Sequence, residues 1–145
     1  RTTVFRQMMF AEFELWTHES FEQGMALTAK DYNAKWHELN VKYFGEDMIV
    51  DEDIDVEWSR IPHFFTDFYV YQYATGYAAA SAFAKNILEG KENAVEKYVG
   101  FLKSGGSDYP IEILKKAGVD MTTSEPLQAT IDRFNELLAM LEKEI

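Results

Sequence analysis

The chain has 145 residues, of which 47% are hydrophobic and 27% charged, and this is enough for a globular domain with a buried core. It carries 14 basic and 25 acidic side chains, a formal net charge of −11. Such a chain repels the phosphates of nucleic acids and of anionic lipids, so we expect neither nucleic acid nor a membrane as a partner. The lack of cysteine excludes disulfides and thiolate metal sites and fits a cytoplasmic location.

The first half of the chain shows helical periodicity interrupted by glycine, with no strand-like alternation. The pattern predicts a first helix over residues 3–23 and a second over residues 28–45. Thr28 and Asp31 at the start of the second helix resemble a capping box, in which an acidic side chain three residues on bonds back to the helix start. The acidic residues 46–55 then read as a solvated connector, followed by a turn of helix.

In the second half of the chain, the sequence predicts a long helix over residues 63–89, which begins after a proline and ends at a glycine. Its uncharged run, residues 68–84, is shorter than the ~20 apolar residues that span a bilayer, so we expect it to be buried in protein. Gly76, Ala80 and Ala84 lie four residues apart, and small residues in such a row let a neighbouring helix approach closely. This helix is therefore expected at the centre of the fold.

Three shorter helices complete the prediction: one over residues 92–102, one over residues 110–118, and a last one that is capped at residues 122–124 and carries an apolar stripe up to Leu141. Pro110 is placed to begin the second of these, because proline fits the first turn of a helix. The sequence thus predicts an all-α, multi-helix bundle of about six or seven helices, with a long central helix near residues 63–89.

The histidines give no complete metal site. His37 and Glu38 begin like the H-E-x-x-H motif of zinc peptidases, but Val41 stands where the second histidine would be. His18 and Glu22 share one helical face, yet two ligands fall short of the three that catalytic zinc usually takes from the protein. A solvated helix face is the expected role of both pairs, and we expect this chain alone to bind no metal.

Residues 61–76 are the most unusual stretch, because one histidine and three tyrosines are concentrated there. On a helix, Tyr69 and Tyr73 share a face and Tyr71 points roughly the opposite way, so the three hydroxyls are not expected to serve one site. The ordinary interpretation is aromatic packing in a core. The alternative is that His63 and a tyrosine project into a cleft and donate hydrogen bonds to a developing oxyanion.

These residues resemble the carboxy-terminal signature of the oligoendopeptidase F family. The resemblance covers nearly the whole chain, and its blocks occur in the family's order. The signature itself consists of Ile61-Pro62-His63-Phe64 and Phe68-Tyr69-Val70-Tyr71-Gln72-Tyr73-Ala74-Thr75-Gly76. A block before it is Val4-Phe5-Arg6-Gln7-Met8-Met9-Phe10-Ala11-Glu12-Phe13-Glu14. The blocks after it are Phe101-Leu102-Lys103-Ser104-Gly105-Gly106-Ser107-Asp108-Tyr109-Pro110 and Lys115-Lys116-Ala117-Gly118-Val119-Asp120-Met121.

The resemblance implies a zinc metallopeptidase, related to thimet oligopeptidase, that cuts short peptides in a deep channel. The family binds zinc through an H-E-x-x-H helix and a later glutamate, which lie upstream of the segment that this chain matches. The chain, residues 1–145, is therefore expected to be the C-terminal helical subdomain of a larger enzyme. Its partners would be the upstream catalytic half and short peptide substrates, and it would be inactive alone.

The resemblance also implies roles for three residues. His63 matches a family histidine, and Tyr71 best matches the tyrosine that faces the oxyanion, so both are expected to be catalytic. Tyr69 is expected to bind substrate. The zinc would belong to the full-length enzyme. A different class of function stays open, a non-catalytic helical binding or interaction domain, because the chain contains no zinc motif.

Overall fold

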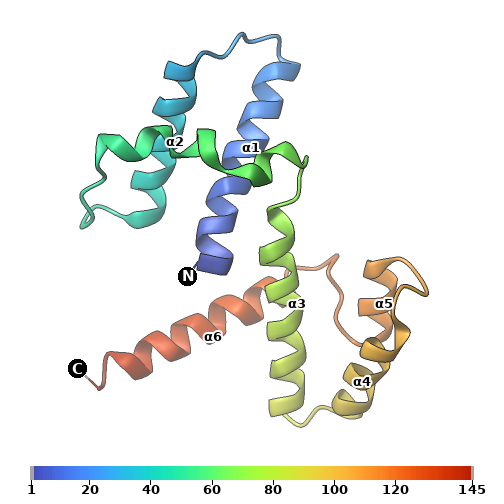
Figure 1. Cartoon of the computed structure of the whole chain (residues 1–145). Coiled ribbons are helices and arrows are strands. Elements are labelled where there is room, and N and C mark those ends of the chain that lie inside the picture. Colours follow the sequence, from blue (N-terminus) through green and yellow to red (C-terminus); the bar gives the residue numbers. More distant parts are fainter. Residues whose placement is uncertain (1, 145) are drawn as a thin grey trace. The chain divides into compact units, whose positions relative to one another are not determined.

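The computed structural model describes residues 2–144 and divides the chain into two compact units, Arg1–Ala74 and Thr75–Ile145 (Figure 1). The described residues form six α-helices and contain no β-strand, which confirms the prediction of an all-α fold. The α-helices are α1 (Gln7–Glu22), α2 (Ala29–Phe44), α3 (Tyr71–Leu88), α4 (Ala94–Ser104), α5 (Pro110–Lys116) and α6 (Glu125–Leu141). A π-helical segment, η1 (Thr2–Arg6), precedes α1, and two 3-10 helices, η2 (Glu52–Arg60) and η3 (Pro62–Phe65), precede α3.

In the first unit α1 and α2 pack against each other, and η2 packs against α2 (Figure 1). The predicted capping box is present, because the Asp31 carboxylate accepts hydrogen bonds from the Thr28 N–H at 2.8 Å and from its hydroxyl at 2.6 Å. Apolar side chains from α1, α2 and the segment after η2 form the core of the unit. Its buried members are Met9, Phe10, Phe13, Trp36, Leu39, Ile61 and Val70.

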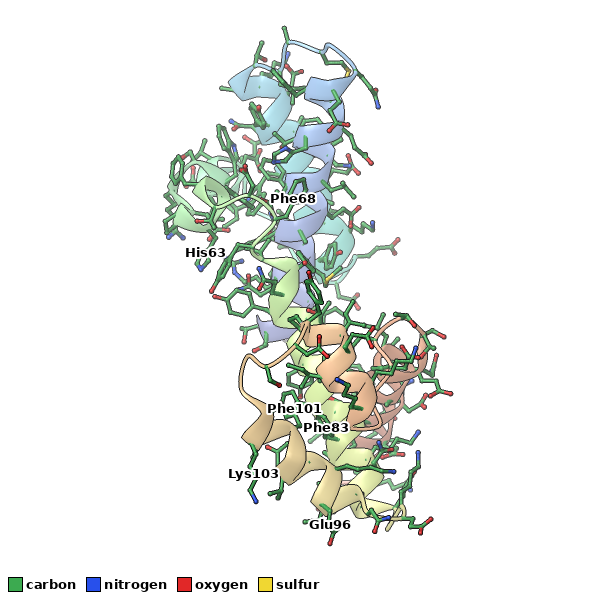
Figure 2. All side chains as sticks on the ribbon, turned by 90° about the vertical axis from the view of Figure 1, so that its right-hand side faces the viewer. His63, Phe68, Phe83, Glu96, Phe101 and Lys103 are labelled. Carbon is green, nitrogen blue, oxygen red and sulfur yellow. The ribbon has the colours of Figure 1, made fainter. Side chains whose placement is uncertain are left out.

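In the second unit, α3 packs its buried Ala79, Ala82 and Phe83 against side chains of α4 and α5. Phe83 and Phe101 lie with ring centroids 5.1 Å apart (Figure 2). The small residues of α3 that are buried differ from those predicted to contact a neighbouring helix, because Gly76, Ala80 and Ala84 are all exposed. Alanines lie on several faces of this helix, so their spacing alone could not identify the face that packs.

The start of α3 differs from the prediction. The helix begins at Tyr71 rather than at residue 63, because residues 66–70 leave the helical path after η3 ends. Phe68 has a φ of +53°, a left-handed conformation that side-chain-bearing residues rarely adopt and that interrupts a right-handed helix. The side chains of residues 63–70 are therefore not arranged with helical spacing, and their contacts cannot be read from it.

Glu57 is a buried carboxylate that links η2 to the beginning of the chain. Only 6% of the residue is exposed, and its Oε1 accepts hydrogen bonds from Arg6 at 2.6 Å and from Arg60 at 2.8 Å. The two guanidinium groups provide the positive charge that a buried carboxylate needs.

Replacing Glu57 with glutamine should lower the free energy of unfolding by about 1–2 kcal/mol. The cost stays below that of a fully buried ion pair because both arginine side chains remain partly hydrated. Urea denaturation measures the change. Glu38→Gln, which removes the exposed Lys35–Glu38 pair, is the matched control and should shift stability by less than about 0.5 kcal/mol. Equal shifts in the two variants would contradict the structural role of Glu57.

Candidate functional site

His63, Tyr69 and Tyr73 form an aromatic cluster in the first unit, between η3 and the first turn of α3. The rings of His63 and Tyr69 are stacked, with centroids 5.8 Å apart and planes inclined by 18°. Tyr73 meets both rings edge-on, at 6.2 Å from His63 and 5.5 Å from Tyr69. The structure therefore brings together two of the three predicted site residues, His63 and Tyr69, and adds Tyr73 to them.

The two phenols of the cluster are joined by a hydrogen bond, with 3.2 Å between the hydroxyl oxygens of Tyr69 and Tyr73. This hydrogen bond, with a smaller contribution from burial, raises the pKa of Tyr73 above its ordinary value of 10. Tyr73 therefore stays protonated at neutral pH and can act as a hydrogen-bond donor. Because one hydroxyl must donate to the other, the pair can offer a second hydrogen to a bound group.

His63 is placed by its neighbour in the 3-10 helix η3. Phe64 packs into the core of the first unit, with ring centroids 5.7 Å from Phe10 and 5.5 Å from Phe13. The adjacent His63, labelled in Figure 2, stacks on Tyr69 of the following loop. The Nδ1 atom of His63 is buried and has no hydrogen-bond partner among residues 2–144. A buried imidazole nitrogen without a partner is unusual in a folded protein.

Tyr71, the third predicted site residue, lies apart from the aromatic cluster. Its side chain is 47% exposed and makes no ring contact or hydrogen bond with His63, Tyr69 or Tyr73 in the described part of the chain. Sequence reasoning gave Tyr73 no role, although its spacing of four from Tyr69 was the signal that the two hydroxyls could meet.

The described residues do not supply a zinc site. No group of three or more histidine, aspartate or glutamate side chains converges anywhere in residues 2–144. His37 hydrogen-bonds Asp55 through Nδ1 at 2.7 Å, and His18 packs against Phe68 with ring centroids 4.5 Å apart. These contacts of His37 and His18 are therefore with residues other than Glu38 and Glu22, the glutamates that the sequence motifs place beside them.

None of the helices within residues 2–144 has the length and apolar character needed to cross a membrane.

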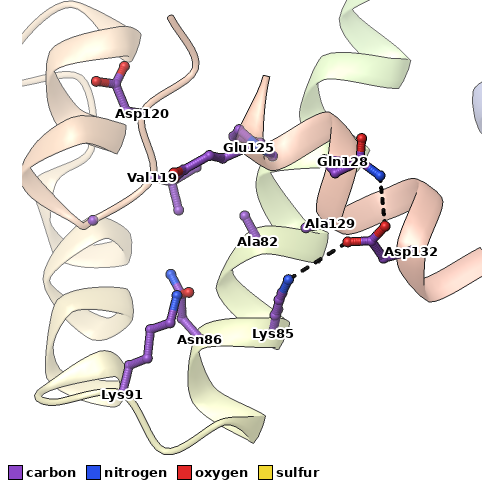
Figure 3. A pocket seen from close by; sticks show the side chains of 12 residues that line it. Ala82, Lys85, Asn86, Lys91, Val119, Asp120, Glu125, Gln128, Ala129 and Asp132 are labelled. Carbon is purple, nitrogen blue, oxygen red and sulfur yellow. Dashed lines mark hydrogen bonds and ion pairs between the residues drawn. The ribbon is translucent and has the colours of Figure 1, made fainter. Parts of the chain in front are cut away.

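The second unit has a hollow of its own, lined by side chains of α3 and α6 and by the segment before α6 (Figure 3). One ion pair lies in this hollow: Lys85 is 4.0 Å from Asp132, whose carboxylate also accepts a hydrogen bond from Gln128 at 2.7 Å. The described residues bring no histidine or tyrosine to this hollow. Its geometry gives no indication of catalysis, and the aromatic cluster remains the candidate site.

Comparison with known proteins agrees with the resemblance seen in the sequence. Oligopeptidase PepF of Bacillus subtilis is 52% identical over 143 residues, which are 99% of this chain and 21% of that protein. The plasmid oligoendopeptidase F of Lactococcus lactis subsp. cremoris is 45% identical over 99% of this chain and 24% of its own length. The crystal structure of oligoendopeptidase-F from Enterococcus faecium matches with a TM-score of 0.94 and 47% identity, over 98% of this chain and 27% of that one.

The chain thus spans about a quarter of the length of the relatives it matches. The resemblance to oligoendopeptidase F is confirmed over nearly every residue. Residues 1–133 match Peptidase family M3, a range that includes the aromatic cluster and Tyr71. On this match and on the identity to its relatives, the chain belongs to peptidase family M3.

Proposed function

We propose that this chain is the C-terminal helical subdomain of a cytoplasmic zinc oligoendopeptidase that hydrolyses short peptides. The observation that carries the proposal is the aromatic cluster, which lies within the segment matched by Peptidase family M3 and holds hydrogen-bond donors beside a buried, unpartnered imidazole nitrogen. Relatives named oligoendopeptidase F, of which this chain covers about a quarter, support the reaction class. The remainder of the enzyme would be the principal partner of this chain.

The proposed work of this chain is to bind the peptide and to stabilise charge in the transition state. Attack on a peptide carbonyl places negative charge on its oxygen, and a preorganised donor aimed at that oxygen lowers the barrier. We assign this role to His63 of the aromatic cluster and, on the resemblance to the family, to the exposed Tyr71, which lies outside the cluster. Tyr69, held beside His63, would hydrogen-bond the peptide backbone and fix its orientation.

The zinc that the family implies would be held outside this chain. The described residues bring no three candidate ligands together, and the histidines with adjacent or turn-spaced glutamates have other partners. We therefore place the zinc ligands in an upstream H-E-x-x-H helix and a following glutamate, and we expect the 145-residue chain alone to be inactive. Its residues contribute donors to the cleft and no ligand to the metal.

The surface of α6 favours this proposal over an independent binding module. One helix carries a series of exposed apolar side chains, which an isolated soluble domain seldom displays together. They include Leu127, Ile131, Leu137, Leu138, Met140 and Leu141. Exposed apolar surface of this kind is expected where a subdomain packs against the rest of a larger protein.

Changing Tyr71 to phenylalanine in the full-length enzyme should lower kcat at least tenfold, because one donor to the oxyanion is lost and such a loss typically costs about 10²–10³-fold. Steady-state kinetics with a short fluorogenic peptide measure the effect, with zinc content checked by elemental analysis. Tyr77→Phe is the matched control, since Tyr77 lies on the same helix and is 49% exposed. An unchanged kcat in Tyr71→Phe would remove Tyr71 from the mechanism.

Tyr69→Phe should act on binding rather than on the chemical step. We expect KM to rise about 3–10-fold while kcat stays within twofold, the pattern of an interaction made equally in the ground and transition states. The ring and its stacking on His63 are retained, so only the hydroxyl is tested. A fall in kcat at constant KM would instead assign Tyr69 to the transition state.

The histidines outside the cluster should be dispensable for the metal. We expect His18→Ala and His37→Ala, each in the full-length enzyme, to keep one zinc per molecule, because neither side chain belongs to a converging ligand set in residues 2–144. Replacement of either histidine in the upstream H-E-x-x-H motif is the positive control and should abolish zinc binding. Loss of zinc from either of the first two variants would contradict the placement of the ligands.

A further inference from the structure

Glu14, on α1, is a buried carboxylate whose role is not explained by the fold alone. Only 5% of the residue is exposed, and no lysine or arginine forms an ion pair with it among residues 2–144. Burial raises the pKa of Glu14 above its ordinary value, because a buried site disfavours the charged form of a carboxyl group. Glu57, the other buried carboxylate of this unit, is neutralised by two arginines.

The partner of Glu14 is the loop that carries Tyr69. Its Oε1 accepts a hydrogen bond of 2.7 Å from the backbone N–H of Phe68, 54 residues further along the chain. Phe68 is the residue with the left-handed φ of +53°, a conformation that persists only where surrounding contacts hold it. A hydrogen bond to a carboxylate is stronger than one between neutral groups, so it is suited to this task.

A second contact from α1 reaches the same residue. His18, one helical turn after Glu14, packs against the ring of Phe68, with centroids 4.5 Å apart and planes inclined by 35°. The backbone of Phe68 is thus held by one side chain of α1 and its ring by another. On the other side of Tyr69, Val70 is fully buried in the core of the unit.

Tyr69 therefore lies between two fixed residues. Its own N–H donates to the carbonyl oxygen of Thr66 at 3.2 Å, which closes the turn. These restraints set the direction in which the Tyr69 side chain leaves the backbone, and so its stacking on His63 and its bond to Tyr73.

We infer that Glu14 is a positioning residue, which holds the loop of residues 66–70 so that Tyr69 is kept against His63 in the aromatic cluster. The consequence for catalysis rests on the proposed function, whereas the positioning does not. The hydrogen bond of Glu14 is to Phe68, which is not a member of the cluster, so Glu14 would act on the cluster through Phe68.

Hydrogen exchange of the full-length enzyme, read by mass spectrometry, tests the positioning directly. In Glu14→Leu, which removes the acceptor at similar volume, amides in peptides covering residues 66–70 should exchange at least fivefold faster. Glu14→Gln keeps an acceptor oxygen and should stay within twofold of the parent. Glu57→Leu is the matched control, because it removes the other buried carboxylate and should leave exchange in this loop unchanged.

Peptidase kinetics on the same variants supply the functional readout. We expect kcat/KM to fall about tenfold in Glu14→Leu and to be restored to within twofold in Glu14→Gln. Should Glu14→Leu fail to fold, His18→Ala removes the second contact to Phe68 and should speed exchange in the same loop at least twofold.

The outcomes separate the two proposals. Faster loop exchange with reduced kcat/KM supports both. Faster exchange with unchanged kcat/KM supports the positioning by Glu14 and removes the aromatic cluster from the proposed mechanism. Loop exchange that is unchanged in Glu14→Leu, or in His18→Ala where that variant replaces it, overturns the inference at any level of activity.

Discussion

The break in the chain at Phe68 is the constraint on which the candidate site depends. In a continuous helix, residues 63 and 69 would be separated by about 240° around the axis and about 9 Å along it, too far for their rings to stack. The left-handed residue bends the path so that the rings of His63 and Tyr69 lie 5.8 Å apart. Helix begins again at Tyr71, and its first turn delivers Tyr73 to the same cluster.

The left-handed conformation at Phe68 is stabilised because the segments on both sides of it are anchored in the same core. Phe64 precedes it and packs against Phe10 and Phe13, while Val70 follows it and is fully buried. Phe13 in turn meets Trp36 edge-on at 4.9 Å, which ties α1 to α2 beneath the loop. Aromatic pairs of this kind add stability beyond the area they bury, and they join the loop to the core of the first unit.

Local signals in the sequence were sufficient for most of the helices. The bond from Thr28 to Asp31 and the proline at the start of α5 both act within one helical turn, and both predicted ends appear in the structure. The break at Phe68 depends instead on Glu14, which lies 54 residues away, and no local pattern records such a contact. The stacking of His63 on Tyr69 follows from this break, so helical spacing in the sequence could not predict it either.

The choice of side chains in the cluster fits a site that must be ready before substrate arrives. Imidazole and phenol groups donate hydrogen bonds without carrying a fixed charge, so they can be partly buried at less cost than lysine or arginine. Tyrosine has few rotatable bonds, and rings that already touch lose little further freedom when a peptide binds. On the proposed function, this acidic chain contributes neutral hydrogen-bond donors that are already in place before the peptide binds. Burying the Glu14 carboxyl group is unfavourable by itself, but it holds the loop that positions these donors.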